Sequence, residues 1–237
     1  GGTFEIEQSA WYIQDSWQIS DRLTVNAGIR QLAISETQKF GHVTYFFNGN
    51  RSGKFDDALE DYIEVPSDIV PFEQRPWMKA AEITDKVVDA ILGGTYDFIR
   101  LNYANGDMVG HTAIPDAVIH AVETLDREVG RLLDAASNAG YSVVLTADHG
   151  NCEEMVDPFT GEPHTQHTTY PVPCLVMDQD NWQLSCGGGL ANVAPTVLHL
   201  MGIAVPAAMP AASLLLKRLP AARHDTRPRP QRLRGVA

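Results

Sequence analysis

Potential metal ligands are grouped at three places in the sequence: Asp107 with His111, Asp148 with His149, and His164 with His167. Carboxylate and imidazole groups together suit borderline divalent ions such as Mn²⁺ or Zn²⁺, whereas all-oxygen sites favour Mg²⁺ or Ca²⁺. Each pair alone has a simpler interpretation, as a helix cap, a hydrogen-bonded turn or part of a loop surface. A shared metal site is the better explanation, because these pairs use four of the eight histidines.

The elements that would position these residues alternate between strands and helices through residues 31–216. Strand patterns are expected at 42–47, 97–103, 141–147 and 173–177, and helical periodicity at 78–92, 115–139 and 192–201. Glycines follow the three helical segments, at Gly93-Gly94, Gly140 and Gly202, where helices commonly end. Such alternation predicts an α/β fold with a mainly parallel sheet covered by helices.

The potential ligands follow the predicted strands. Asp107 and His111 come after the strand at 97–103, and Asp148 comes directly after the strand at 141–147. Ligands in open α/β sheets collect at the carboxyl ends of the strands. We therefore expect the three pairs to lie near one another, although 56 residues separate His111 from His167.

Charge is distributed unevenly along the 237 residues, whose net charge is −12. Seven of the 18 basic residues lie in the last 21 positions, so residues 1–216 contain 11 basic and 29 acidic side chains. A body this acidic would repel nucleic acid. The Arg- and Pro-rich segment 216–237 is expected to be a disordered, solvated tail, with a nucleic-acid-binding arm as the less favoured alternative.

Cysteine content and hydropathy bear on location. The three cysteines, Cys152, Cys174 and Cys186, are odd in number and widely spaced, which favours reduced thiols and a cytoplasmic protein. No apolar run approaches the roughly 20 residues that a membrane-spanning helix needs. The sequence therefore predicts no membrane partner.

Residues 1–30 differ from the rest because polar and apolar positions alternate as in strands, with a turn at Ser20-Asp21-Arg22. The stretch WYIQDSWQISDRLTVNAGIR resembles a strand segment of TonB-dependent outer-membrane receptors. This predicts a join between unrelated segments near Arg30 and Gln31. An outer-membrane receptor piece is accordingly one alternative identity, although it would cover little of the chain.

From Gln31 to about Leu215 the chain resembles the carboxyl-terminal part of cofactor-independent (2,3-bisphosphoglycerate-independent) phosphoglycerate mutases, in the alkaline-phosphatase superfamily. The stretches that carry the resemblance are QLAISETQKFGHVTYFFNGN (31–50), EITDKVVDAI (82–91), NYANGDMVGHT (102–112), TADHGNCEEM (146–155), PHTQHTTYPVP (163–173) and GGGLANVAPTVLHLMGI (187–203). The resemblance implies an alkaline-phosphatase-like but incomplete domain over 31–215, between the leader 1–30 and the tail 216–237.

The resemblance also implies roles for individual residues. The family holds two Mn²⁺ ions, and by the resemblance one would bind Asp107, His111 and His167, while Asp148 and His149 would supply half of the second site. Lys39 matches the family lysine that places positive charge beside the substrate phosphate; its simpler interpretation is a solvated surface lysine. His164 matches the other histidine of the same motif and would support the ligands from outside, whereas Cys152 is interpreted as an ordinary small residue.

The family interconverts 3-phosphoglycerate and 2-phosphoglycerate, a step of glycolysis, through a metal-activated serine. The sequence of residues 1–237 does not match the family segments that contain this serine and the arginine-bearing substrate domain. We therefore expect the chain to belong to a family of isomerases but to be inactive by itself. The alternatives are a non-catalytic metal-binding remnant or fusion product and a generic metal-dependent phosphatase. The stretch 31–50 favours the mutase over the phosphatase.

Overall fold

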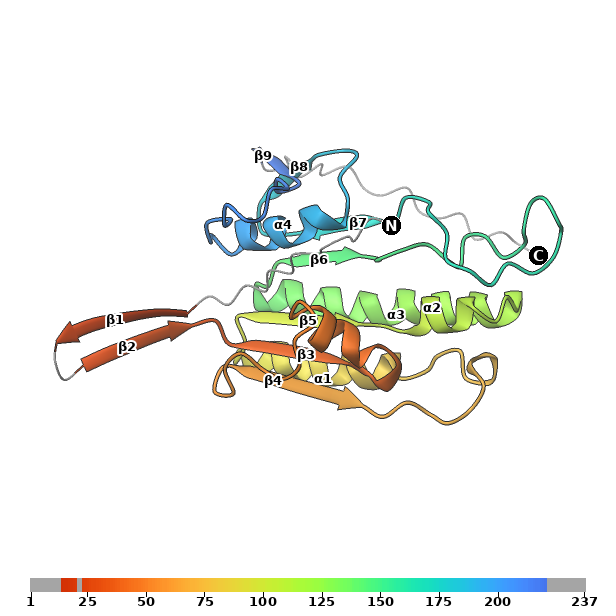
Figure 1. Cartoon of the computed structure of the whole chain (residues 1–237), viewed down its shortest axis with the longest axis horizontal. Coiled ribbons are helices and arrows are strands. Elements are labelled where there is room, and N and C mark those ends of the chain that lie inside the picture. Colours follow the sequence, from red (N-terminus) through yellow and green to blue (C-terminus); the bar gives the residue numbers. More distant parts are fainter. Residues whose placement is uncertain (1–13, 21–22, 221–237) are drawn as a thin grey trace, which may run out of the picture. The chain divides into compact units, whose positions relative to one another are not determined.

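A computed structural model describes residues 14–20 and 23–220 of the chain, which divides into two compact units, Gly1–Met177 and Asp178–Ala237. In the first unit the strands are β1 (Gln14–Ser20), β2 (Leu23–Gly28), β3 (Gln31–Glu36), β4 (Glu60–Val65), β5 (Phe98–Asn102), β6 (Val143–Thr146) and β7 (Cys174–Met177). The helices there are η1 (Thr37–Lys39), η2 (His42–Phe46), η3 (Phe72–Gln74), α1 (Ala80–Gly93), α2 (Asn105–Gly110) and α3 (Pro115–Ala139). Figure 1 shows their arrangement.

The centre of the first unit is a three-stranded parallel sheet in the order β4-β3-β5. Gln31 of β3 is in register with Glu60 of β4 and with Phe98 of β5. Strand β3 is buried on both faces, as expected for the middle strand of a covered parallel sheet. The predicted α/β class and parallel sheet are confirmed.

Helices α1 and α3 pack together and cover one face of this sheet (Figure 1). Their contacts with the strands form the main hydrophobic core, whose buried members are Leu32, Ile34, Val65, Ile83, Val87, Ile91, Leu132 and Ala136. Full burial of one such aliphatic side chain stabilises the fold by about 1.5–3 kcal/mol. The core therefore fixes the sheet against the helices, and with it the strand ends that carry the site.

Two helices end as the sequence predicts. Gly94 follows α1 with φ 60°, and Gly140 follows α3 with φ 78°. Both values lie in the left-handed region, where a side chain is costly and glycine is favoured. Pro115 occupies the first turn of α3, where its missing N–H breaks no helical hydrogen bond.

The segment 42–47 is not the strand that its β-branched and aromatic residues suggest. Residues 42–46 form the wide helical turn η2, and Asn48, two residues beyond it, donates its backbone N–H to the carbonyl oxygen of Thr44 at 2.9 Å. The Thr44 hydroxyl also donates to the carbonyl oxygen of Phe40 at 2.7 Å. Strand propensity describes how a side chain fits a half-buried sheet, and here the chain has just left β3 and must turn. Tertiary context therefore overrides the local preference.

Strand pairing elsewhere in the first unit is antiparallel. Strands β6 and β7 pair with Val143 opposite Met177, and β1 and β2 pair with Gln14 opposite Gly28. The strand patterning expected in the leader is present in β1 and β2, while Asp21 and Arg22 of the expected turn lie outside the described residues.

The second unit contains β8 (Asn181–Leu184), η4 (Leu190–Asn192), α4 (Val193–Leu200) and β9 (Leu215–Leu219), and β8 pairs antiparallel with β9. Helix α4 matches the predicted helix at 192–201, with Gly202 beyond it at φ 70°. The predicted disordered tail begins at residue 216, but β9 extends to Leu219 because its backbone pairs with β8. Residues 221–237 of that tail lie outside the described residues.

Within the described part of the chain, no helix combines the length and the apolar character needed to cross a membrane.

Candidate metal centre

Helix α2 presents Asp107 and His111 on the same side. The helix begins three residues after β5 ends, so it lies at the carboxyl end of a sheet strand. Residues four apart in a helix are neighbours on its surface. Nε2 of His111 accordingly lies 3.0 Å from Oδ1 of Asp107.

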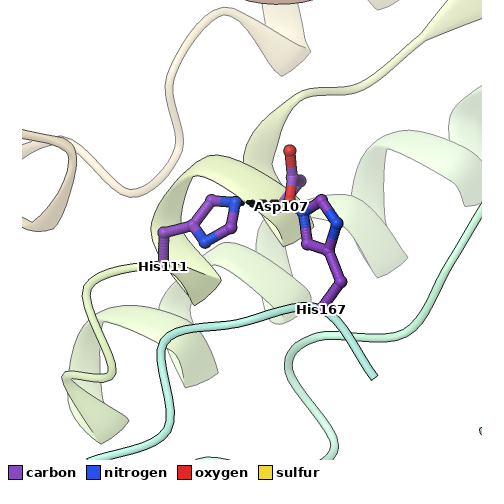
Figure 2. A group of neighbouring side chains, drawn as sticks. All are labelled: Asp107, His111 and His167. Atoms are coloured by element: carbon purple, nitrogen blue, oxygen red, sulfur yellow. Dashed lines mark hydrogen bonds and ion pairs between the residues drawn. The ribbon is translucent and has the colours of Figure 1, made fainter. Parts of the chain in front are cut away.

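His167 joins this pair from a loop between β6 and β7. Its Nε2 lies 2.9 Å from Oδ1 of Asp107 and 3.1 Å from Nε2 of His111. Figure 2 shows the two imidazole rings and the carboxylate turned toward one another. One potential ligand atom from each of the three residues lies within 4.8 Å of the others. The expected convergence is therefore present in the structure.

The donor set fits a borderline divalent ion. Two imidazole nitrogens and one carboxylate oxygen surround a common point, and three protein ligands leave further coordination positions open. The tautomer of His111 also suits ligation. Its Nδ1 donates to the carbonyl oxygen of Thr165 at 2.7 Å, which leaves Nε2 of the neutral ring as a lone-pair donor.

Asp148 and His149, another predicted ligand pair, lie beside the three-residue cluster of Asp107, His111 and His167. The ring of His149 stacks on that of His167 with centroids 3.6 Å apart, and its Nε2 lies 3.9 Å from Oδ1 of Asp107. Its Nε2 is 3.6 Å from Oδ2 of Asp148. The Asp148 carboxylate is half exposed, and this pair offers two further potential ligand atoms beside the cluster.

Lys39 is not the solvated surface lysine of the simpler interpretation. It lies in η1, immediately after β3, and the residue is only 7% exposed. Its Nζ is 2.5 Å from Oδ2 of Asp107. The lysine therefore brings a buried positive charge to the same carboxylate that contacts His111 and His167.

The electrostatics of Asp107 follow from these neighbours. Burial opposes ionisation of the carboxyl group, but the Lys39 ammonium, His111 and the Asn151 amide stabilise the carboxylate more strongly. Together they hold the pKa of Asp107 at about 2, below its ordinary value of 3.8. Asp107 is thus a carboxylate at any pH at which histidine can bind a metal ion.

Three further residues at this site were not predicted from the sequence: His42, Asn151 and Glu153. Nε2 of His42 lies 3.5 Å from Nζ of Lys39, and burial together with the Lys39 charge lowers the pKa of His42. Asn151 donates from its amide to Asp107, and Glu153 accepts the backbone N–H of Asn151 at 2.8 Å. The only available signal was proximity in sequence, because His42 follows Lys39 by three positions and Asn151 follows His149 by two.

His164 and Cys152 are not members of the cluster formed by Asp107, His111 and His167. Nδ1 of His164 donates to the carbonyl oxygen of Glu154 at 3.1 Å, which ties down the loop that also bears His167. The Cys152 thiol donates to the carbonyl oxygen of Gly106 at 2.9 Å, and burial raises its pKa. Cys152 therefore packs as a neutral thiol beneath α2.

The amino-acid sequence of the chain is similar to those of known phosphoglycerate mutases. Over 190 residues the chain is 50% identical to the 2,3-bisphosphoglycerate-independent phosphoglycerate mutase of Rhodopirellula baltica, covering 79% of this chain and 35% of the relative. The enzyme of the same name from Syntrophotalea carbinolica is 48% identical over 190 residues, with 80% of this chain and 37% of the relative covered. The chain thus spans little more than a third of the length of these relatives.

A solved structure is similar as well. It is described as Leishmania mexicana phosphoglycerate mutase at low cobalt concentration, with a TM-score of 0.73 and 40% sequence identity. The match covers 79% of this chain and 37% of that one. The resemblance to cofactor-independent phosphoglycerate mutases and the alkaline-phosphatase-like, incomplete fold are thereby confirmed.

The family model that matches is the Metalloenzyme superfamily, over residues 13–205. The match begins inside the leader, before the join expected at Arg30 and Gln31, and these comparisons give no support to the receptor resemblance of residues 1–30. Since the model covers most of the chain and includes every residue of the candidate centre, the chain belongs to the Metalloenzyme superfamily.

Proposed function

We propose that residues 31–215 are the metal-binding part of a Mn²⁺-dependent phosphoglycerate mutase, which interconverts 3-phosphoglycerate and 2-phosphoglycerate in glycolysis. The convergence of Asp107, His111 and His167 carries this proposal, because three ligand atoms within 4.8 Å form the core of a divalent-ion site. The mutase relatives supply the reaction and the phosphoglycerate substrate.

In this proposal one ion binds Asp107, His111 and His167, and a second binds Asp148 and His149 with ligands from outside residues 31–215. Bound divalent ions would activate a nucleophile and offset charge on phosphoryl oxygens. Lys39 would add positive charge beside the phosphate, which its buried position next to Asp107 supports. The carboxylate of Asp107 is already ionised and needs no proton loss to accept a cation.

We further propose that these 237 residues bind metal but do not turn over phosphoglycerate by themselves. The chain spans 35–37% of the length of two mutase relatives, and the serine nucleophile of the family is assigned to a segment that this sequence does not match. A non-catalytic metal-binding remnant is the second candidate, since the grouping of Asp107, His111 and His167 supports metal binding without catalysis. A reducing, cytoplasmic setting is part of the proposal and is supported by three free cysteines in the described residues.

Calorimetric titration with Mn²⁺ tests the metal site. The intact chain should bind one ion tightly, and His111→Ala and His167→Ala should each weaken binding by at least about tenfold. His120→Ala is the control for loss of one imidazole, because His120 is an exposed residue of α3 whose ring lies 5.6 Å from that of Trp77. Binding that is absent in the intact chain, or unchanged in both ligand variants, would refute the proposal.

A further inference from the structure

Asn151 is a buried polar residue that contacts a predicted metal ligand. It follows Asp148, His149 and Gly150 and is 5% exposed. Its Nδ2 lies 3.3 Å from Oδ1 of Asp107 and 3.4 Å from the backbone carbonyl oxygen of the same residue. Asn151 thus binds both the side chain and the backbone of Asp107.

The chemistry of the amide sets its orientation. Both groups that Asn151 faces on Asp107 only accept hydrogen bonds, so the NH₂ of the amide must point at them. This leaves Oδ1 of Asn151 buried without a hydrogen-bond partner among the described residues. A buried unsatisfied acceptor costs about 1–3 kcal/mol, so packing alone would be served better by an apolar residue.

Helix α2 leaves space for this amide. A Cβ atom on Gly110 would overlap the carboxamide of Asn151. The φ of Gly110 lies outside the left-handed region, so the backbone conformation there does not require glycine. Glycine is required at position 110 because the amide of Asn151 approaches the backbone closely. Gly110 directly precedes His111.

Asn151 is itself held by the loop that carries His167. Its backbone N–H donates to Oε2 of Glu153 at 2.8 Å, and the other oxygen of Glu153 accepts the hydroxyl of Thr168. Thr168 also donates its backbone N–H to the carbonyl oxygen of Gly150 at 2.9 Å. One side of Asn151 is therefore tied to the residue after His167, and its amide is tied to Asp107.

We propose that Asn151 is the positioning residue of the metal centre: its amide holds Oδ1 of Asp107 toward His111 and His167 and keeps α2 in register with the loop that bears His167. The inference rests on the proposed function, because it assumes that these three residues bind a divalent ion. Partners that orient a metal ligand in this way typically affect metal affinity by about 10–100-fold when removed.

The chain contains a matched control in Asn105. That residue is also fully buried, has an unpartnered Oδ1 among the described residues, and donates from Nδ2 to a backbone carbonyl oxygen, that of Pro76 at 2.8 Å. Asn105 is the first residue of α2 but its amide contacts no predicted ligand. Leucine has nearly the shape of asparagine but no hydrogen-bond donor. Asn151→Leu and Asn105→Leu therefore each remove one buried amide donor, at two different positions.

The experiment measures Mn²⁺ affinity by calorimetry, the visible absorption of bound Co²⁺, and the melting temperature of the metal-free chain. Asn151→Leu should bind Mn²⁺ about 10–100-fold more weakly and alter the Co²⁺ spectrum, which reports ligand geometry. Asn105→Leu should stay within about threefold of the unaltered affinity and keep its spectrum, whatever its melting temperature. Asn151→Ala, which also lacks the donor, should weaken binding as Asn151→Leu does, and it decides the question if the leucine variant does not fold.

Two results would overturn the inference. If the unaltered chain binds Mn²⁺ and the folded Asn151 variants bind it equally well, Asn151 serves packing only and the proposed metal site stands. If the unaltered chain binds no Mn²⁺, the proposed function fails and the role of Asn151 fails with it.

Discussion

Lys39 and Asp107 form a buried ion pair in which Nζ lies 2.5 Å from Oδ2, while the other carboxylate oxygen contacts both His111 and His167. The Lys39 ammonium therefore offsets the charge of the carboxylate at Oδ2, and a bound metal ion would offset it at Oδ1. A cation that enters the site must share Asp107 with this ammonium. We therefore expect the ion pair to affect both the affinity for metal ions and the folding stability at acidic pH.

Replacing Lys39 by methionine should tighten Mn²⁺ binding. Methionine keeps an unbranched apolar side chain but removes the competing charge, so the affinity should rise by about three- to tenfold, or about 0.7–1.4 kcal/mol. Titration calorimetry at pH 7.5 measures this directly. Lys54→Met, which removes a partly exposed lysine paired with Asp57 at 4.0 Å, is the control for loss of one positive charge. Weaker binding in Lys39→Met would contradict the competition.

The metal stoichiometry should be one Mn²⁺ per chain. Asp148 and His149 offer only two ligand atoms, and Nε2 of His149 is 3.9 Å from Asp107, farther than either ring of the three-residue cluster. His149→Ala should therefore change the affinity of the single ion by less than about fivefold, much less than His167→Ala. Two tight ions per chain would show that Asp148 and His149 already belong to a complete second site.

The folding stability of the metal-free chain should fall at acidic pH partly because of Asp107. Its pKa is lowered from 3.8 in the reference state to about 2 in the folded state, so the unfolded chain takes up the proton first. The stabilisation is fully present above about pH 4 and disappears as pH falls through 2. It amounts to about 2 kcal/mol.

Chemical denaturation in the presence of a chelator, at intervals from pH 5 to pH 2, measures this loss. Lys39→Met should be less stable near pH 5 and should lose less stability on acidification, because the ammonium that lowers the pKa is gone. Parallel stability curves for the two proteins would indicate that the ion pair does not account for the shift.

Mn²⁺ affinity should rise between pH 5 and pH 8. An imidazole must be unprotonated to bind a metal ion, and histidine side chains ordinarily lose their proton near about pH 6.5. Asp107 remains ionised throughout this range, since its pKa is about 2. The gain should therefore come from the histidines, and equal affinity at pH 5 and pH 8 in calorimetry would argue against histidine ligation.

Mutase turnover by the purified chain should be undetectable with Mn²⁺ present. Metal ions activate a nucleophile but do not replace it, and positioning of substrate by a binding domain can supply about 7–11 kcal/mol of a barrier. Conversion of 3-phosphoglycerate, coupled to downstream enzymes, is the assay, with a full-length mutase relative as positive control. Turnover above roughly 1 s⁻¹, within the usual range for enzymes, would mean that a residue such as Ser35 or Thr37 acts as the nucleophile.

Structural features that depend on residues close together in the sequence were predictable from the sequence. The helical period of 115–139 and the following glycine mark α3 because both signals arise within one stretch of chain. The position of Asp107 after β5 likewise places it at the carboxyl end of a parallel strand, whereas the strand before Asp148, β6, pairs antiparallel with β7. The α/β class, most helix bounds and the grouping of potential ligands therefore follow from residue types and their spacing.

Contacts between distant segments were decided only by the tertiary structure. Residues 42–47 have the composition of a strand, yet the turn after β3 makes them helical, because propensity is a weak preference compared with packing. The pairing of Lys39 with Asp107 joins residues 68 positions apart, and that of Asn151 with Asp107 joins residues 44 apart. The sequence alone determined which residue types could bind a cation, whereas their distances, burial and lowered pKa depend on how α2, η1 and the loop bearing His167 pack together.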